Sequence, residues 1–123
     1  EWWLDARRSV TQYTASMHDI QTYQAEDGSE PYARWLAGLA DRQARARVPV
    51  RVQRMAAGNF GDCKPLDGGV WELRIDWGPG CRVYYAMAGR RVLLLVGGDK
   101  RRQRADIAAA LGYWQDWQRR NAT

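Results

Sequence analysis

VWELRIDWGPGCRVYYAMAGRRVLLLVGGD, residues 70–99, contains three strand patterns in close succession. The first pattern alternates between apolar and polar residues, with Trp71, Leu73, Ile75 and Trp77 on one face and Glu72, Arg74 and Asp76 on the other. This period of two is typical of a strand with one buried face. The run VLLLV, residues 92–96, is continuously apolar, as expected of a central strand buried on both faces and ending at Gly97-Gly98. The stretch therefore predicts an antiparallel sheet.

The GPG sequence, residues 78–80, predicts a tight hairpin between the first two of these strands. A three-residue loop would place three pairs opposite each other: Trp77 with Cys81, Arg74 with Tyr84, and Asp76 with Arg82. One hairpin face would then group Glu72, Arg74, Asp76, Arg82 and Tyr84. Such a group is either a solvated face, whose ion pairs contribute about 0 to 1 kcal/mol each, or a binding site.

Before this stretch, the sequence predicts one strand and two helices. HDIQTYQ, residues 18–24, has a strand pattern, and Pro31 suits the first turn of a helix with an apolar stripe at Tyr32, Trp35, Leu36 and Leu39. Asp41 is suited to cap a second helix, which would bury Ala44, Val48, Val52 and Met55. Pro49 lies inside that helix and predicts a kink or a late start.

After the stretch, Asp99 is suited to cap a C-terminal helix. Its apolar stripe comprises Ile107, Ala110, Leu111, Trp114 and Trp117, which either packs on the sheet or forms a partner surface. The expected fold is α+β: an N-terminal strand, two helices, an antiparallel sheet of three to four strands, and a C-terminal helix. We expect the helices on one face of the sheet, with Arg74, Arg82 and Tyr84 on the opposite face.

The composition favours one soluble domain and an anionic partner. The chain has 123 residues and a formal net charge of +5, with 19 Lys and Arg residues of which only Lys64 and Lys100 are lysines. Arginine suits contact with phosphate or carboxylate, although an arginine-rich composition by itself also explains the charge. No apolar stretch is long enough to span a membrane. Cys63 and Cys81 lack a CxxC spacing, which argues against zinc and favours free thiols in the cytoplasm.

The first 16 residues, EWWLDARRSVTQYTAS, do not fit the signal-peptide pattern, and Met17 follows them directly. We expect translation to start at Met17, so that residues 1–16 are a non-native or mis-started leader that is poorly ordered. The alternative is an added strand or helix. Residues 17–123 would then form the single domain.

The side chains present limit the chemistry that this domain can perform. The chain has one histidine, His18, and no carboxylate or histidine cluster at metal-ligand spacing, so metal-dependent hydrolysis and a nucleophile–histidine pair are not expected. Metal-free phosphoryl transfer remains, since arginines and lysines can stabilise charge on a phosphate. RNA supplies its own nucleophile, the 2′-hydroxyl, and a lysine can accept a proton where burial and neighbouring cations lower its pKa.

Four motifs follow each other in an order that resembles a known family. They are ARAR (residues 44–47), GNFGD-x-KP (58–65), ELRI-x-x-GPG-x-RVYY (72–85) and LLL-x-GGDK-x-x-Q-x-x-DI (93–107). Over about residues 18–117 the chain resembles the RelE/ParE superfamily of toxins from type II toxin–antitoxin modules, and most closely its HigB-like group of addiction-module killer proteins.

The resemblance implies an mRNA endonuclease that inhibits translation at the ribosome without a metal or other cofactor. It implies a neighbouring helix-turn-helix antitoxin as partner, in a toxin–antitoxin hetero-oligomer. On this basis the expected catalytic residues are Lys64, Arg74, Arg82 and Lys100. Arg74 and Arg82 would hold the scissile phosphate, and Lys100 or Lys64 would accept the proton. The expected RNA contacts are Tyr84, Tyr85, Arg101 and Arg102.

Two other functions stay open at the level of sequence. A ParE-like toxin inhibits DNA gyrase by binding it and is not an enzyme, and fold alone does not decide between the two. An inactive toxin could also serve only as the antitoxin's corepressor. Keeping Lys64, Arg74, Arg82 and Lys100 favours the nuclease, because a gyrase inhibitor does not need a basic sheet face.

Overall fold

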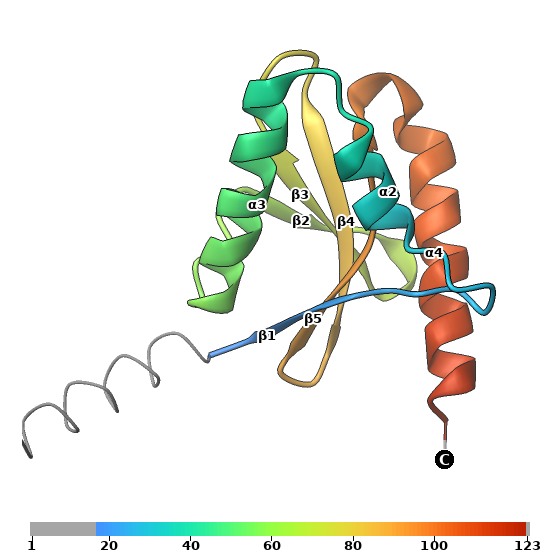
Figure 1. Ribbon diagram of the computed structural model, residues 1–123. Helices are drawn as coiled ribbons and strands as arrows, with labels where there is room; N and C mark the ends of the chain where they lie inside the picture. Colours follow the sequence, from blue (N-terminus) through green and yellow to red (C-terminus); the bar gives the residue numbers. More distant parts are fainter. Residues whose placement is uncertain (1–16, 123) are drawn as a thin grey trace, which may run out of the picture.

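The computed structural model of the chain describes residues 17–122, so the expected leader, residues 1–16, lies outside the described residues. The elements are β1 (Asp19–Thr22), α2 (Pro31–Ala37), α3 (Arg42–Ala56), β2 (Cys63–Pro65), β3 (Val70–Ile75), β4 (Cys81–Ala88), β5 (Arg91–Asp99) and α4 (Gln103–Arg120) (Figure 1). Two short 3₁₀ helices, η1 (Asp67–Gly69) and η2 (Lys100–Arg102), precede β3 and α4.

The strands form one five-stranded sheet in the order β1-β5-β4-β3-β2. β1 runs parallel to β5, whereas the other neighbours are antiparallel. The α+β class is confirmed, and β2 to β5 form an antiparallel set of four strands, within the predicted three to four, which the N-terminal strand β1 joins in parallel. The strand Cys63–Pro65, which pairs with β3, is too short to show an alternating pattern in the sequence. The pairing of β1 with β5 cannot be predicted from the residues of β1 alone.

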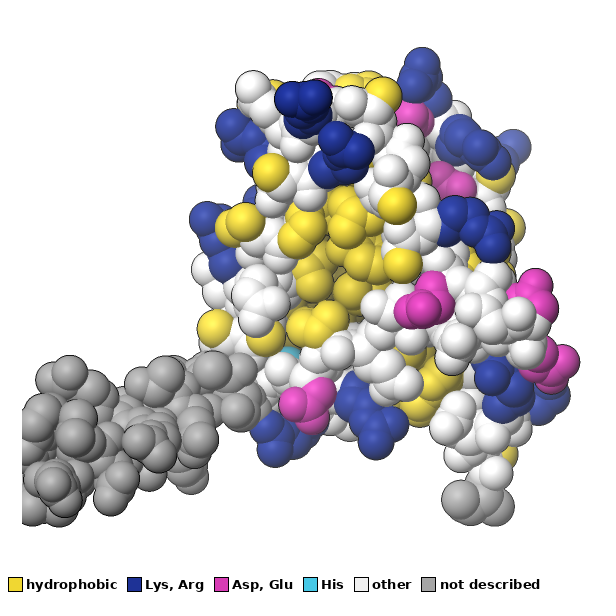
Figure 2. All heavy atoms as spheres, viewed as in Figure 1, with side chains coloured by type: hydrophobic (Ala, Val, Ile, Leu, Met, Phe, Trp, Pro, Cys, Tyr) yellow, Lys and Arg dark blue, Asp and Glu magenta, His cyan; other side chains and the backbone are white. Residues whose placement is uncertain are grey.

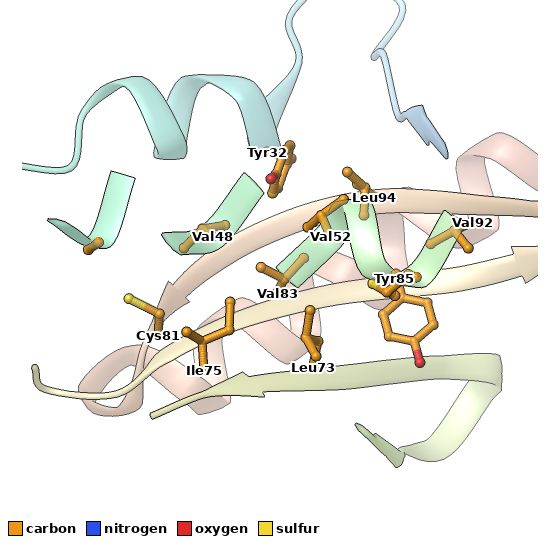
Figure 3. Packing of buried hydrophobic residues seen from close by; sticks show 12 residues of the cluster. Tyr32, Val48, Val52, Leu73, Ile75, Cys81, Val83, Tyr85, Val92 and Leu94 are labelled. Atoms are coloured by element: carbon orange, nitrogen blue, oxygen red, sulfur yellow. The ribbon is translucent and has the colours of Figure 1, made fainter. Parts of the chain in front are cut away.

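Helices cover both faces of the sheet, so the prediction that they lie on one face is wrong. α2 and α3 cover one face, where Val48, Val52, Val83 and Leu94 pack together (Figure 3). α4 covers the other face through Ala110 and Trp114, which pack on residues such as Leu93 and Leu95. Because the central strands carry apolar residues on both faces, a one-sided cover would leave one set in water. The apolar stripe of α4 therefore packs on the sheet, which was one of the two predicted roles, the other being a partner surface.

α3 begins where its cap predicts. The Asp41 carboxylate accepts hydrogen bonds from the backbone N–H groups of Gln43 and Ala44, at 2.9 and 3.3 Å. The four predicted core residues of this helix are all buried. The helix runs from Arg42 through Pro49 to Ala56, so the expectation of a late start is wrong. The cap and the buried stripe outweigh the backbone donor that Pro49 lacks.

The hairpin between β3 and β4 has a longer loop than predicted. Ile75 pairs with Cys81, Arg74 with Arg82 and Glu72 with Tyr84, so the register is shifted by two residues. Asp76 and Trp77 lie in the loop, because tertiary contacts hold the indole toward α3: its Nε1 donates to Asp41 Oδ2 at 3.1 Å, and Arg47 stacks over the ring at 3.9 Å. A shift of two residues keeps every side chain on its face, so the predicted polar group largely survives.

β5 continues beyond its predicted end at Gly97-Gly98 to Asp99. Asp99 caps η2 by accepting a hydrogen bond from Arg101 N at 2.8 Å, and α4 follows from Gln103. The β3–β4 turn and the start of α4 lie at the same end of the sheet (Figure 1). Among the helices in residues 17–122, none has the length and apolar character needed to span a bilayer.

Candidate functional site

Two arginines lie side by side at the end of the sheet near η2. Arg74 of β3 pairs with Arg82 of β4, which pairs with Gly98 of β5, so the three positions form a row across the strands. Paired residues in antiparallel strands are about 4.5 to 5.5 Å apart at Cα. The row therefore presents two guanidinium groups next to each other on the face covered by α4.

Lys100 joins the two arginines through the loop that follows β5. Its backbone N–H donates to the carbonyl oxygen of Gly80 at 3.1 Å, which fixes η2 against the hairpin turn. Arg74, Arg82 and Lys100 line one pocket of about 320 Å³, together with the turn and the carboxylates of Asp62 and Asp76. This pocket, the basic pocket, brings together three of the four predicted catalytic residues.

Glu72 lies behind the basic pocket and holds its arginines. Its side chain is only 1% exposed, and Oε1 lies 3.3 Å from Arg74 Nε and 3.8 Å from Arg82 Nε. Oε2 accepts a hydrogen bond from Gln103 Nε2 at 2.6 Å. One buried carboxylate thus connects both guanidinium groups to the first residue of α4. The Arg82 side chain is 13% exposed and the Arg74 side chain 40%, so both remain accessible from the pocket.

The turn depends on glycine. Gly78 and Gly80 have φ values of 59° and 91°, in the left-handed region that glycine adopts without strain. A Cβ on Gly80 would lie 3.2 Å from Arg82 Nη1. Gly80 therefore leaves room for the guanidinium group in the basic pocket.

Lys64 is exposed on β2 and pairs with Glu72, one strand further out than the arginines. It shares the α4 side of the sheet with them, because paired residues point to the same face. It is not among the residues that line the basic pocket. Of the two candidate proton acceptors, only Lys100 lies in the pocket.

The two tyrosines predicted to contact RNA are buried on opposite faces. Tyr84 is fully buried with the α4 cluster, and Tyr85 is 2% exposed in the α3 cluster. Burial, with the nearby carboxylates of Glu72 and Asp106, raises the pKa of Tyr84. Burial and the neighbouring Cys63 raise the pKa of Tyr85. The structure therefore brings neither ring to the surface of the basic pocket.

Arg101 and Arg102 are exposed on η2, next to Lys100. Arg101 Nη2 pairs with Asp99 Oδ2 at 2.9 Å, at the protein surface. Neither residue lines the basic pocket, and Arg102 lines a pocket on the other side of the end of β5. Figure 2 shows that further Lys and Arg side chains follow the flank of α3, whereas hydrophobic side chains lie in a hollow between α3 and α2.

Sequence reasoning placed Glu72 in the polar group but gave it no role beyond surface pairing, and it missed Gln103 and Gly80. Their only signal was position within the motifs ELRI, GPG and GGDK-x-x-Q. Within residues 17–122 no three His, Cys, Asp or Glu side chains come together as a metal ion would require. Chemically, the basic pocket can bind a phosphate through two guanidinium groups and an ammonium group.

No family model matches the chain. An uncharacterized protein of Haemophilus influenzae is 47% identical to it over 77 residues, which make up 62% of this chain and 78% of that protein. This identity extends over most of the relative's length. The chain belongs to the same family as this uncharacterized Haemophilus influenzae protein.

Proposed function

We propose that the protein is the toxin of a type II toxin–antitoxin module and acts as a ribosome-dependent mRNA endonuclease that needs no metal. The observation that carries the proposal is the convergence of Arg74, Arg82 and Lys100 on one pocket, with Glu72 buried behind it. The resemblance of the motifs to the RelE/ParE superfamily and its HigB-like group supports the same reading. The partners would be mRNA on the ribosome and a helix-turn-helix antitoxin.

In this proposal the two arginines bind the phosphate that is attacked by the neighbouring 2′-hydroxyl. The O2′–P bond forms as the P–O5′ bond breaks, which gives a 2′,3′-cyclic phosphate, and the leaving 5′-oxygen takes a proton from solvent water. Their positive charge stabilises the additional negative charge of the transition state. Lys100 lines the same pocket and is our candidate for accepting the proton of the 2′-hydroxyl. Lys64, one strand further out, would instead contact the RNA backbone. Arg101 and Arg102 would bind adjacent phosphates.

The test is primer extension on a defined mRNA in a cell-free translation system, with and without ribosomes. We expect ribosome-dependent cuts by the wild type, and a loss of about 100-fold or more in Arg82→Ala and Lys100→Ala. Arg91→Ala is the matched control, since Arg91 is exposed at the opposite end of β5. Lys64→Ala separates the two lysines, because a binding role predicts a smaller loss than a proton-transfer role.

The alternative is inhibition of DNA gyrase by binding, without catalysis. The exposed arginines of α3, including Arg47 and Arg54 beside a groove of about 540 Å³, would suit an acidic protein surface. If the translation assay gives no cuts, inhibition of DNA supercoiling in an assay with gyrase would support this alternative. Failure of both assays, with intact antitoxin binding, would leave the role of an inactive corepressor.

A further inference from the structure

A second pocket, of about 600 Å³, lies on the other side of the β5 end from the basic pocket. Its walls come from α2, with Arg34 and Trp35, and from η2 and α4, with Arg102, Asp106 and Tyr113. The last four residues of β5, Val96 to Asp99, form its floor. We call it the edge pocket. Asp99 lines the edge pocket and the next residue, Lys100, lines the basic pocket, so the two pockets adjoin.

The floor of the edge pocket is an unpaired strand edge. β1 pairs with β5 only as far as Leu94, and the last bond on that side is Tyr23 N to Leu94 O, at 2.9 Å. A β-bulge at Leu95 shifts the alternation of β5, so Val96 and Gly98 face β4, where they pair with Tyr84 and Arg82. The backbone groups of Gly97 and Asp99 therefore point toward the edge pocket. In the described part of the chain no strand pairs with them there.

Two side chains pack directly against this floor because its two central residues are glycines. A Cβ on Gly97 would collide with the Trp35 ring, and a Cβ on Gly98 would collide with the Asp106 carboxylate. The indole and the carboxylate thus lie on opposite faces of the strand, at either side of the pocket. Tyr113 adds a second aromatic ring on the α4 side.

Asp106 is the unusual group in this pocket. Asp106 is only 9% exposed, and its Oδ2 has no hydrogen-bond partner among the described residues. Arg102, which lies on the rim, forms no ion pair with it within 4.0 Å in the described residues. A buried acceptor without a donor destabilises the folded state, so the fold retains this carboxylate at a cost in stability.

We propose that the edge pocket binds one guanine base of the RNA whose phosphate lies in the basic pocket, an inference that rests on the proposed function. Guanine carries two adjacent donors, N1–H and N2–H₂, that match a carboxylate such as Asp106. RNA-binding proteins commonly stack unpaired bases on aromatic side chains and bind their edges by hydrogen bonds. Trp35 and Tyr113 provide the rings, and the free edge at Gly97 and Asp99 provides further backbone partners.

The neighbouring strands place this base next to the phosphate. Arg82 pairs with Gly98, and the Asp106 carboxylate occupies the space where a side chain of Gly98 would be. A nucleotide whose phosphate contacts Arg82 therefore has Asp106 one strand away. Arg34 and Arg102, both exposed on the rim, lie beside the path of the backbone. Adenine offers a ring nitrogen acceptor where guanine has N1–H, and is disfavoured at a carboxylate.

The test is the affinity of the full chain for two 2′-O-methylated RNA hexamers, measured by fluorescence anisotropy without ribosomes. One hexamer is all adenosine, and the other has one guanosine. We expect the wild type to bind the guanosine hexamer about tenfold more tightly. Asp106→Asn should bind both hexamers as weakly as the wild type binds the all-adenosine one. Asp67→Asn, which changes an exposed carboxylate on η1, should keep the preference.

The outcomes separate this inference from the proposed function. Arg82→Ala should weaken binding of both hexamers equally and retain the preference for guanosine. Equal binding of the two hexamers by the wild type, or a preference that survives in Asp106→Asn, overturns the base pocket while leaving the basic pocket intact. A preference lost in Asp106→Asn together with no effect of Arg82→Ala supports the base pocket and contradicts the phosphate site. Absence of binding to either hexamer overturns the base pocket, while the cleavage assay with ribosomes decides the proposed function independently.

Discussion

At the scale of single residues, Glu72 is the side chain on which the basic pocket depends. It is a buried carboxylate with three partners, Arg74, Arg82 and Gln103, from two strands and a helix. A buried charge is tolerated when its partners compensate it, and removing one member leaves the others uncompensated. Glu72 therefore links the stability of the sheet end to the geometry of the basic pocket.

Replacing Glu72 should destabilise the fold. In Glu72→Ala, Gln103 loses its acceptor and Arg82 keeps a positive charge without a buried partner. We expect the free energy of unfolding to fall by about 2 to 4 kcal/mol, measured by urea denaturation. Glu26→Gln, at an exposed glutamate, is the control and should change it little. Equal stability of the two variants would mean that Glu72 is not needed to compensate the arginines.

Replacing Asp106 should have the opposite effect on stability, and the size of this effect should depend on pH. Burial raises the pKa of Asp106, an effect that Arg102 partly offsets. Since the folded-state pKa lies above the unfolded value of about 3.9, the protein loses stability as pH rises through this window. Asp106→Asn removes the charge, so its melting temperature should exceed that of the wild type at pH 7.

The difference between Asp106→Asn and the wild type should shrink as pH falls and level off below about pH 3, where the carboxyl group is protonated in both states. Melting curves across this range check it. A wild type that is more stable than Asp106→Asn at pH 7 would contradict the prediction. A variant that is more stable but has lost base preference would indicate that Asp106 is retained for binding.

At the scale of elements, α3 is a helix that keeps a proline in its interior. Pro49 lacks the N–H that would bond to the carbonyl of Arg45, yet the helix is continuous from Arg42 to Ala56. The Asp41 cap and the buried residues on the sheet side provide the compensation. The same cap receives the Trp77 indole, so α3 also shapes the hairpin loop beside the basic pocket.

Pro49→Ala should stabilise α3, because it restores one hydrogen bond and removes a steric conflict. We expect the free energy of unfolding to rise by about 1 to 3 kcal/mol in urea denaturation. Pro31→Ala is the matched control: Pro31 occupies the first turn of α2, where the missing N–H costs nothing, and its replacement should not stabilise. A Pro49→Ala variant no more stable than Pro31→Ala would show that the helix already absorbs the proline without strain.

At the scale of the whole molecule, the sheet carries a hydrophobic cluster on each face. Leu94 belongs to the cluster under α2 and α3, and its neighbour Leu95 to the cluster under α4. Both side chains are almost fully buried, at 2% and 0% exposure. Since successive residues of β5 serve opposite faces, the two clusters share their central strand and should unfold together.

Leu94→Ala and Leu95→Ala should therefore have similar effects, each lowering the free energy of unfolding by about 2 to 5 kcal/mol. Unfolding should remain one transition, with coincident curves from tryptophan fluorescence and far-UV circular dichroism. A mild effect of Leu95→Ala alone would mean that α4 contributes little to the core. Separate transitions would mean that the two faces unfold independently.

Much of the secondary structure follows from short-range patterns in the sequence. The alternation in β3, the apolar run of β5, the Asp41 cap and the stripe of α4 each depend on residues a few positions apart, and all appear in the structure. Arg74 and Arg82 were grouped on one face although the predicted register was off by two residues. Their grouping survived because side chains alternate with a period of two, so an even shift leaves the face unchanged.

Tertiary structure alone decided which of these residues meet. The hairpin register depends on Trp77 binding Asp41 and Arg47, residues that are 36 and 30 positions earlier in the chain. The contact of η2 with the turn selects Lys100 rather than Lys64 for the basic pocket, and α4 buries Tyr84 and holds Asp106 over Gly98. The sequence by itself determined the elements and the faces of its strands, because those depend on local periodicity. Packing of distant elements determined the pockets, because their walls come from segments that no local pattern relates.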